Sequence, residues 1–579
     1  MDDVLDEWSY AILTWETGDA KENIHNQQKI RCFFLGSPCF CLNQVVQRRD
    51  IALKIKEVSE KVDEIANERA RHGLQINRGT DEIQRLISTS LVDELNVCGR
   101  DDEKKIIVSK LLNEMDDNNL GKASVETSIE RVRHLSMMLP GETSFPSSIH
   151  RAKGLRSLLI RNTRGSSRLR AALPDVMKQL TCIRSLNMSG SSIEEIPKEV
   201  GKLIHLRHLN LNDCRELVSL PETMCDLCNL QSLDVMWCCS LKKLPLATVK
   251  LVNLRHLCID GSGVAFMPKG IERLTCLRTL DCFIVCGGGE NESKAANLRE
   301  LRNLHHIGGS LKIRNLQGGG IEDAAEAQLK NKKRLLCLEL NFCVNYEDDI
   351  LFEALQPPSD LEILTIKSYG GIVLPNWMMA LTRLQELTLE GCGNLEVLPS
   401  LGRLPNLESL ELELVGVRRL DAGFLGIEEV ENANNINEVE IARVTAFPKL
   451  KTLVISFLFK LKEWDGIERR VGEEDATTIS IFIMPQLQQL EIFGCPLLRA
   501  LPDYVLAAPL QVLEITDCPN LMKRYGKEEK GEDWHKISHI PKVIGMLKKI
   551  FTNNRRYDVP SWDLLMAILS LANSFSLGS

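Results

Sequence analysis

The side chains whose type and spacing could do chemistry in this sequence form a series of arginines. They recur every 23 to 28 residues when Gln231, which occupies one position of the series in place of an arginine, is counted with them. The six are Arg133, Arg156, Arg184, Arg207, Arg255 and Arg278. A guanidinium group is always charged, and its donors match the geometry of a carboxylate or phosphate. Regularly stacked positive charges repel one another unless an acidic partner lies against them. The series therefore indicates binding of acidic groups.

Two sets of carboxylates supply the opposite charge. The first opens the chain, at Asp2, Asp3, Asp6 and Glu7. The second comes late in the sequence, at Glu386, Glu390, Glu408, Glu411 and Glu413, and further on at Glu491 and Glu514. A surface that is basic early and acidic late is suited to a polar or basic protein partner. The alternative is that the late acids serve only solubility.

No group of residues has the spacing of a catalytic or metal site. His25, Cys32, Cys39 and Cys41 match no standard zinc pattern, so packing is the stronger interpretation. The histidines, for example His208, stand beside apolar residues and are expected to face solvent or a strand edge. We therefore expect a protein that is not an enzyme and has no cofactor and no metal.

The elements that must position the arginines belong to an internal repeat. From about Val132 to Cys518, an apolar residue, two variable residues, an apolar residue, one variable residue and an apolar residue recur. Successive copies in the regular runs begin 23 or 24 residues apart, inside the range of roughly 20–29 residues for leucine-rich repeats. Clear copies begin at Leu155, Ile183, Leu206, Leu230, Leu254, Leu277, Leu361, Leu384, Leu407, Leu450, Leu487 and Leu510. The pattern predicts short parallel strands, whose apolar faces are buried only when copies stack.

Prolines and cysteines follow the same period. Six prolines each stand nine residues before the next copy and predict the start of a return segment: Pro174, Pro197, Pro221, Pro245, Pro268 and Pro375. Six cysteines at the ninth position are expected to be small buried thiols, rather than a metal or redox site: Cys214, Cys238, Cys343, Cys392, Cys495 and Cys518. The sequence thus predicts an α/β fold, a leucine-rich-repeat solenoid over residues 128–525 with parallel strands on the concave face of a horseshoe. Residues 421–446 and 465–485 are predicted to be loops that leave it.

The ends of the chain do not show the repeat. Apolar residues at steps of three and four between residues 48 and 71 predict an amphipathic helix, so residues 1–75 are expected to be a partial helical coiled-coil domain. Residues 76–127 are interpreted as a linker and residues 526–579 as a tail.

Several segments together resemble one family. DDVLDEW at residues 2–8 is similar to the acidic motif in the third coiled-coil helix of plant coiled-coil, nucleotide-binding, leucine-rich-repeat disease-resistance proteins. QRRDIALKIKEVSEKVDEIANER resembles the fourth helix, and TSLVDE with CGRDDEK resembles the entrance to the nucleotide-binding domain. The DCPNL and HKISHIP endings resemble the same family's C-terminal region. The resemblance implies that the acidic motif, Asp2 to Glu7, docks onto the arginine series. A solvated basic edge is the alternative.

The nucleotide-binding domain of that family has no counterpart here. No Gly-Lys pair is followed by Ser or Thr, as a phosphate-binding loop requires. The sequence passes from about Met115 directly to the repeats, so neither ATP nor ADP is expected to bind. The resemblance implies a plant immune protein that recognises a pathogen effector or a guarded host protein without the nucleotide switch. A truncated regulator or decoy of full-length relatives, and a nonfunctional remnant, are the alternatives.

Composition and net charge limit the classes of partner and the compartment that we expect for this protein. The net charge of −8 argues against nucleic acid, which requires a concentrated basic face. The 19 cysteines spread over 579 residues favour a reducing compartment over a secreted disulfide framework. The first ten residues are not those of a signal peptide, and Leu564 to Ala572 is too short an apolar run to span a bilayer. We expect a cytoplasmic protein without stable membrane insertion.

Overall fold

The structure is a computed structural model. It describes residues 132–139, 147–162, 167–317, 321–343, 349–427, 443–465, 480–526 and 531–545. The predicted coiled-coil domain and linker, and the tail beyond residue 545, lie outside the described residues. The chain divides into two compact units, unit 1 (residues 1–367) and unit 2 (residues 368–579).

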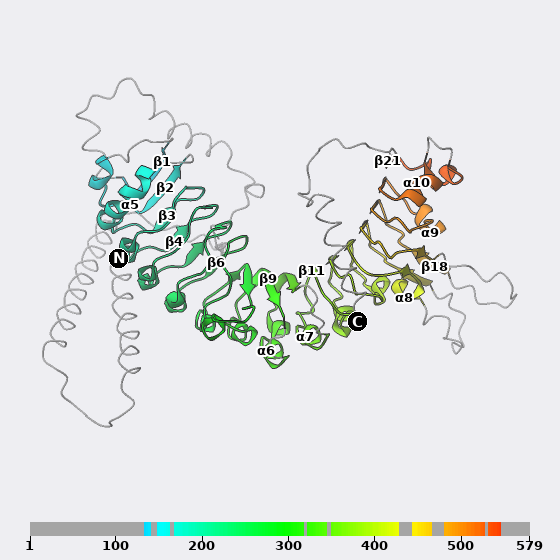
Figure 1. The fold of residues 1–579 in the computed structure, drawn as a ribbon, viewed down its shortest axis with the longest axis horizontal. Helices are drawn as coiled ribbons and strands as arrows, with labels where there is room; N and C mark the ends of the chain where they lie inside the picture. The colour runs from blue at the N-terminus through cyan, green and yellow to red at the C-terminus, as the bar shows by residue number, and fades with distance from the viewer. Residues whose placement is uncertain are drawn as a thin grey trace, which may run out of the picture. The chain divides into compact units, whose positions relative to one another are not determined.

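In unit 1 the repeat copies form parallel strands in chain order (Figure 1). The first sheet contains β1 (His134–Leu139), β2 (Ser157–Asn162), β3 (Ser185–Asn187), β4 (His208–Asn210), β5 (Ser232–Asp234), β6 (His256–Cys258) and β7 (Thr279–Leu280). A further run of parallel strands follows: β8 (Cys282–Ile284), β9 (Gly308–Leu316), β10 (Arg334–Phe342) and β11 (Ile363–Lys367). The prediction of a leucine-rich-repeat solenoid with parallel strands is confirmed.

The register explains why these sequences form strands. Leu186, Leu209, Leu233 and Leu257 are paired along the sheet, and each is at most 2% exposed. The residues on either side of the first three point to the opposite face, where they are half-buried. One copy alone would leave this apolar row in water, so the stack of copies makes the core.

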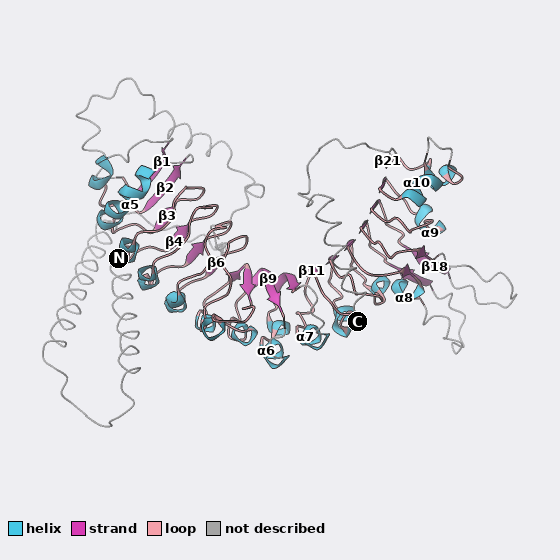
Figure 2. Cartoon of the chain, viewed as in Figure 1, coloured by secondary structure: helices cyan, strands magenta, loops and turns pink. Residues whose placement is uncertain are grey.

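Return segments complete each copy on the side away from the strands (Figure 2). In unit 1 they contain η3 (Ser147–Arg151), α5 (Ser167–Gln179), η4 (Lys198–Lys202), η5 (Glu222–Asp226), η6 (Leu246–Lys250), η7 (Ile271–Arg273), η8 (Glu292–Lys294), η9 (Leu298–Leu301), α6 (Ile321–Glu326), η10 (Leu329–Asn331) and α7 (Asp349–Ala354). Pro197, Pro221 and Pro245 are the residues before η4, η5 and η6, as their spacing predicts. Pro174 differs, because it lies inside α5.

Unit 2 repeats the arrangement. Its strands are β12 (Glu386–Glu390), β13 (Ser409–Glu413), β16 (Thr452–Ser456), β19 (Gln489–Phe493), β20 (Val512–Thr516) and β21 (Lys542–Ile544), paired in parallel. Its helices are η11 (Asn376–Ala380), η12 (Leu401–Arg403), α8 (Ala422–Leu425), α9 (Asp503–Leu506), α10 (Pro519–Tyr525) and α11 (Trp534–Ile537). Residues 531–545, expected to lie beyond the repeats, thus contribute one more strand to the sheet.

The two polar insertions of unit 2 are only partly loops. Two small parallel sheets form beside them: β14 (Arg419–Leu420) pairs with β17 (Glu463–Trp464), and β15 (Arg443–Ala446) pairs with β18 (Ser480–Ile483). The centres of both insertions, residues 428–442 and 466–479, lie outside the described residues.

Most described copies leave their strand through a left-handed residue. In unit 1 this position holds Gly190, Asp213, Trp237 and Gly261, with φ between 57° and 70°. The N–H groups of Asp213 and Trp237 donate to carbonyl oxygens of the next copy, so the turn extends the backbone ladder. Trp237 is 53% exposed, and a Cβ at Gly261 would lie 2.6 Å from its ring. Only glycine therefore fits beneath the indole.

The ninth-position cysteines are mostly core residues. Cys214, Cys238, Cys392, Cys495 and Cys518 are fully buried, whereas Cys343 is partly exposed. The thiols of Cys214 and Cys238 donate to carbonyl oxygens of the preceding copy at 3.2 and 3.1 Å. These contacts fit the prediction of small buried thiols.

Candidate functional site

The arginines predicted to be a series stack in register in unit 1. Each arginine after Arg133 donates its backbone N–H to the carbonyl oxygen of its counterpart one copy earlier, at 2.7–2.8 Å, and Gln231 takes part in the same way. We call this series the arginine ladder: Arg133, Arg156, Arg184, Arg207, Arg255 and Arg278, interrupted by Gln231. Adjacent ladder residues are therefore about 4.8 Å apart along the sheet.

The side chains of the ladder differ in exposure and pairing. Arg133, Arg156, Arg255 and Arg278 are exposed, and Arg184 and Arg207 are half-buried. Arg133 donates to the carbonyl oxygen of Gly154 at 2.8 Å. Within the described part of the chain, Arg255 and Arg278 form no ion pair. Two adjacent guanidinium groups without an ion pair have the donors and charge that suit a carboxylate.

The acids proposed to meet the ladder are not part of the described chain. Asp2, Asp3, Asp6 and Glu7 fall in residues 1–131, so their docking stays a prediction.

A second column, next to the ladder, contains histidines. His208, Ser232 and His256 are paired across β4, β5 and β6, each directly after its ladder residue. Burial lowers the pKa of His208, and Arg207 and Arg255 lower it further. Burial, Arg278, His208 and Arg255 do the same to the pKa of His256. Both imidazoles therefore favour the neutral form beside the ladder.

Carboxylates lie on the other side of the same sheet face. Asp234 ends β5, and Asp281 follows β7. The Asp281 carboxylate accepts the N–H groups of Ile259, at 2.8 and 3.0 Å, and Asp260, at 3.0 Å. Burial raises the pKa of Asp281, while these two donors hold it down. The sheet face of unit 1 is thus basic along one edge of its strands and acidic along the other.

Asp281 interrupts the sheet. Leu280 pairs with Leu257, and Phe283 pairs with Ile313, so two residues separate them where regular copies have one. The extra residue is a bulge, which bends a strand and increases its twist. In earlier copies the N–H equivalent to that of Ile259 bonds to a backbone carbonyl oxygen, as Val235 does to Cys258. Here the Asp281 carboxylate replaces that carbonyl.

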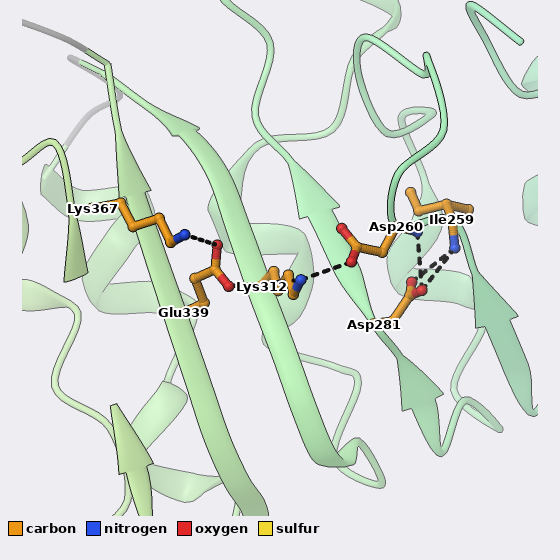
Figure 3. A network of polar contacts seen from close by, with 6 residues as sticks. All are labelled: Ile259, Asp260, Asp281, Lys312, Glu339 and Lys367. Carbon is orange, nitrogen blue, oxygen red and sulfur yellow. Dashed lines mark hydrogen bonds and ion pairs between the residues drawn. The ribbon is translucent and has the colours of Figure 1, made fainter. Parts of the chain in front are cut away.

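Beyond the bulge, charges alternate across the strands. Figure 3 shows Lys312 reaching toward Asp260, and Lys367 reaching toward Glu339. The Nζ–O distances are 2.7 Å for Lys312–Asp260, 3.7 Å for Lys312–Glu339 and 3.9 Å for Lys367–Glu339. These side chains neutralise one another, in contrast to Arg255 and Arg278.

The acidic residues predicted in unit 2 share one sheet face. Glu390 and Glu413 are direct partners on β12 and β13, and Glu411 is half-buried on β13 between two buried leucines. Glu386 is exposed. Glu408 is different, because Lys451 contacts it at 2.7 Å. The set is therefore less uniformly acidic than its sequence indicates.

Sequence reasoning missed several polar residues. The signal for Asp281 is visible in hindsight as one extra residue between the apolar positions Leu280 and Phe283. Lys332, 2% exposed, donates its Nζ to the carbonyl oxygens of Leu301 and Leu304 at 2.7 and 3.0 Å. Burial lowers its pKa to about 8. Nothing in the local pattern marks this lysine as a core residue.

Among residues that the structure describes, no three metal-ligating side chains gather into one cluster. The same part of the chain contains no helix with the length and apolar character needed to cross a bilayer.

Comparison with known proteins places the fold in a family. A family model described as a leucine-rich repeat region matches residues 183–496. The chain belongs to this leucine-rich-repeat family. The match covers β3 to β19 and so includes most of the ladder.

The repeats also match proteins named for disease resistance in plants. RGA1 of Solanum bulbocastanum is 35% identical over 59% of this chain and 32% of its own length. RGA2 of the same species is 32% identical over 56% of the chain and 32% of its own length. An RPP13-like protein 1 of Arabidopsis thaliana is 30% identical over 68% of the chain and 40% of its own length. The matched region thus spans about a third of the curated relatives.

Solved structures with similar repeats are more distant. A leucine-rich-repeat protein of Leptospira interrogans has a TM-score of 0.43 and 20% identity, over 73% of this chain and 98% of that one. An internalin of Listeria monocytogenes has a TM-score of 0.40 and 18% identity, over 66% of this chain and 92% of that one.

Proposed function

We propose that this chain is a plant immune protein whose repeats recognise a protein partner, a pathogen effector or a guarded host protein. The single observation that carries the proposal is the in-register arginine ladder on the sheet face of unit 1. The ladder belongs to a leucine-rich-repeat region, and these repeats are similar to those of plant proteins named for disease resistance. In this proposal the ladder takes acidic side chains of the partner, which offset its self-repulsion.

The proposal includes no catalytic step and no nucleotide switch. Its basis is the sequence, where no Gly-Lys pair precedes Ser or Thr. The 15 cysteines that the structure describes are all free thiols, which supports a reducing compartment, and we assign the protein to the cytoplasm. The purified full-length chain is expected not to bind fluorescent analogues of ATP and ADP. Saturable binding at micromolar concentrations would contradict the absence of a nucleotide switch.

The chain's own N-terminus is one acidic occupant that the proposal allows. Neutralising Asp2, Asp3, Asp6 and Glu7, as Asn or Gln, should free the ladder. A synthetic peptide of residues 1–12 should then bind the variant roughly tenfold more tightly than it binds the wild-type chain. Equal affinities would indicate that these acids do not occupy the ladder in the intact protein.

The immune role is tested in leaves. Silencing the gene should change pathogen growth, and a silencing-resistant wild-type copy should restore it. A copy with Arg255→Glu and Arg278→Glu should fail to restore it, because the ladder then repels acidic groups. Arg273→Glu is the matched control, since Arg273 is an exposed arginine on the return segment before Arg278. Restoration by the double variant to the wild-type level would refute a role for the ladder.

A second function is a regulator or decoy of full-length relatives. It is suggested by the similarity of these repeats to those of the relatives, 35% identity to RGA1 and 32% to RGA2. The purified chain would then bind a full-length relative directly, and removal of that relative from leaves would abolish the effect of silencing. An effect that persists without the relative favours direct recognition.

A further inference from the structure

Cysteines occupy the ninth position of neighbouring copies at two places in the described part of the chain. Cys214 and Cys238 form one such pair, in unit 1, and Cys495 and Cys518 form the other, in unit 2. All four are free thiols, and all four are fully buried. Because the two pairs share repeat position and burial, a difference between them reflects their local contacts.

In unit 1 each thiol of the pair is held by the copy before it. Sγ of Cys214 donates to the carbonyl oxygen of Met188 at 3.2 Å. Sγ of Cys238 donates to the carbonyl oxygen of Leu211 at 3.1 Å. Burial raises the pKa of Cys214 to about 11 and that of Cys238 to about 12. These two thiols are therefore bonded to backbone and stay protonated near neutral pH.

The thiols of the pair in unit 2 are turned differently. The corresponding distances are longer, 3.7 Å from Cys518 to the carbonyl oxygen of Ile492 and 4.0 Å from Cys495 to that of Ile455. Each sulfur lies closer, at 3.3 Å, to the carbonyl oxygen two residues before it. The N–H of Cys495 donates to Sγ of Cys518 at 3.3 Å, and the two thiols are hydrogen-bonded to each other. The contact between sulfurs thus replaces the tighter bond to the preceding copy.

Strand register brings Cys495 and Cys518 within reach of a disulfide. Phe493 and Thr516 are direct partners on β19 and β20, and each cysteine follows two residues later. Neighbouring parallel strands are about 4.8 Å apart. The Cα atoms of disulfide-bonded cysteines are separated by roughly 4.4–6.8 Å. Rotation of the two side chains can therefore join the sulfurs with little movement of the backbone.

The hydrogen bonds between the two cysteines give them different roles. Donation from Cys495 lowers the pKa of Cys518, although burial opposes this. The same hydrogen bond, together with burial, raises the pKa of Cys495. The thiolate is the nucleophilic form of a cysteine. Cys518 is therefore the residue of the pair that reacts first, and Cys495 keeps its proton.

We propose that Cys495 and Cys518 are a site of oxidative modification, at which a peroxide converts the two thiols to a disulfide between neighbouring copies. The thiolate of Cys518 attacks a peroxide oxygen, the O–O bond breaks, and the released hydroxide takes up the proton that Cys518 lost and leaves as water. The thiol of Cys495 then attacks the resulting sulfenic acid, the S–O bond breaks, and that oxygen leaves as a second water with the proton of Cys495. Two thiols lose two electrons in total, and one peroxide gains them.

Both sulfurs are buried, so the oxidant reaches them when the last copies open locally. The final described strand is β21, where Val543 is half-buried. Its counterparts Leu490 and Leu513, on β19 and β20, are fully buried. The copies at the end of a solenoid have fewer neighbours than those in the middle and open at a lower free energy. Oxidation of the pair should therefore be slower than that of the exposed thiol of Cys276.

The disulfide changes the acidic sheet face of unit 2. It closes a loop between residues 23 apart and ties β19 to β20. Glu491 and Glu514 are direct partners on these strands, and like charges opposite each other are destabilising. The bond therefore holds together two strands that this charge pair pushes apart. A reducing compartment restores the thiols, so the modification is transient. The inference does not depend on the arginine ladder or on its partner.

The experiment maps disulfides in the full-length chain. The reduced protein is treated with hydrogen peroxide at neutral pH, denatured, alkylated at its remaining thiols and digested with trypsin without reductant. Peptides 471–499 and 500–523, which contain Cys495 and Cys518, should appear joined in the mass spectrum and should separate on reduction. The joined form should be about tenfold or more as abundant as any link between Cys214 and Cys238, whose thiolates are suppressed by burial.

Single variants test the assigned roles. In Cys495→Ala the sulfenic acid of Cys518 has no thiol to condense with, so dimedone present with the peroxide should label peptide 500–523. In Cys518→Ala, labelling of Cys495 should be roughly tenfold lower, because Cys495 keeps its proton. Cys392→Ala is the matched control, since Cys392 is a buried ninth-position thiol with no cysteine in the copies beside it. It should form the disulfide as the wild-type chain does.

Hydrogen exchange gives a second readout that does not depend on the mass of the linked peptides. The amides of β19 and β20 should exchange about tenfold more slowly in the oxidised wild-type chain than in the reduced one, and peroxide should not slow them in Cys495→Ala. Peptide mapping of the wild-type chain needs no variant, so a variant that does not fold leaves that test in place.

Three results would overturn the proposal. The first is oxidation of Cys276 without any link between Cys495 and Cys518. The second is separate conversion of Cys495 and Cys518 to sulfinic acids. The third is an equal yield of the links in unit 1 and unit 2, because the contacts that distinguish the two pairs would then have no effect on their chemistry.

Discussion

The carboxylate of Asp281 accepts the backbone N–H of Ile259 at 2.8 and 3.0 Å, in place of the carbonyl oxygen that performs this task in earlier copies. A side chain thereby closes the backbone ladder at the point where one extra residue shifts the register. These hydrogen bonds tie the end of β6 to the bulge, next to Asp260, which forms an ion pair with Lys312 (Figure 3). The contact lies where the first sheet ends at β7 and the next begins at β8.

Removal of that carboxylate should destabilise unit 1. Asp281→Ala leaves the N–H groups of Ile259 and Asp260 without an acceptor, at a cost of about 2–3 kcal/mol in the free energy of unfolding. Asp281→Asn retains one acceptor oxygen and should cost about 1 kcal/mol. Urea unfolding measures both. Asp226→Ala, at an exposed aspartate that ends η5, is the control and should change stability by less than about 0.5 kcal/mol. An Asp281→Ala protein as stable as this control would contradict the role assigned to the bulge.

The buried lysine predicts a pH effect of definite sign. Lys332 has its pKa lowered from 10.5 to about 8 by burial, and its Nζ meets only carbonyl oxygens among its hydrogen-bond partners in the described chain. Between pH 8 and 10.5 the unfolded lysine holds a proton that the folded one has released, so stability rises with pH. Relative to Lys332→Met, the wild-type protein should gain roughly 1–2 kcal/mol between pH 8 and 9.5. A difference between the two proteins that stays constant over this interval would show that Lys332 is not desolvated.

The buried thiols predict that stability falls as pH rises, the opposite of the effect of Lys332. Burial raises the pKa of Cys225, Cys238 and Cys282 from 9.0 to about 12. Their contribution is complete below pH 9 and is lost as pH rises from 9 toward 12, because unfolded thiols ionise first. In the Cys238→Ala protein, the free energy of unfolding should fall less steeply with pH, by up to about 1.4 kcal/mol per pH unit. Cys276→Ala, at an exposed thiol, should leave the slope unchanged. Identical slopes in all three proteins would mean that Cys238 is accessible to water.

Sequence reasoning predicted the features that depend on periodicity. The ladder residues, the core leucines and Pro197, Pro221 and Pro245 all lie where a fixed repeat length puts them. A parallel stack converts equal sequence spacing into spatial alignment, so a periodic pattern is enough to place these residues.

Features that break the period could not be predicted in the same way. Asp281 acts through its side chain on a neighbouring copy, and Lys332 enters the core because two distant carbonyl oxygens accept from it. Pro174 lies inside α5 although its spacing matches the other prolines. The pairing of β15 with β18 joins segments near the ends of two separate insertions. The contacts of Asp281 and Lys332 and the β15–β18 pairing join residues far apart in sequence, and a fixed repeat length does not specify such partners.

The central claim is that the arginine ladder recognises acidic groups through their charge, and a charge exchange tests it most directly. The affinity of the peptide of residues 1–12 would be measured against one with its four acids replaced by lysine. Both are titrated into the chain with neutralised N-terminal acids, with and without Arg255→Glu and Arg278→Glu. The parent protein should prefer the acidic peptide by roughly tenfold or more, and the charge-reversed protein should prefer the lysine peptide. The same preference in both proteins would contradict the account.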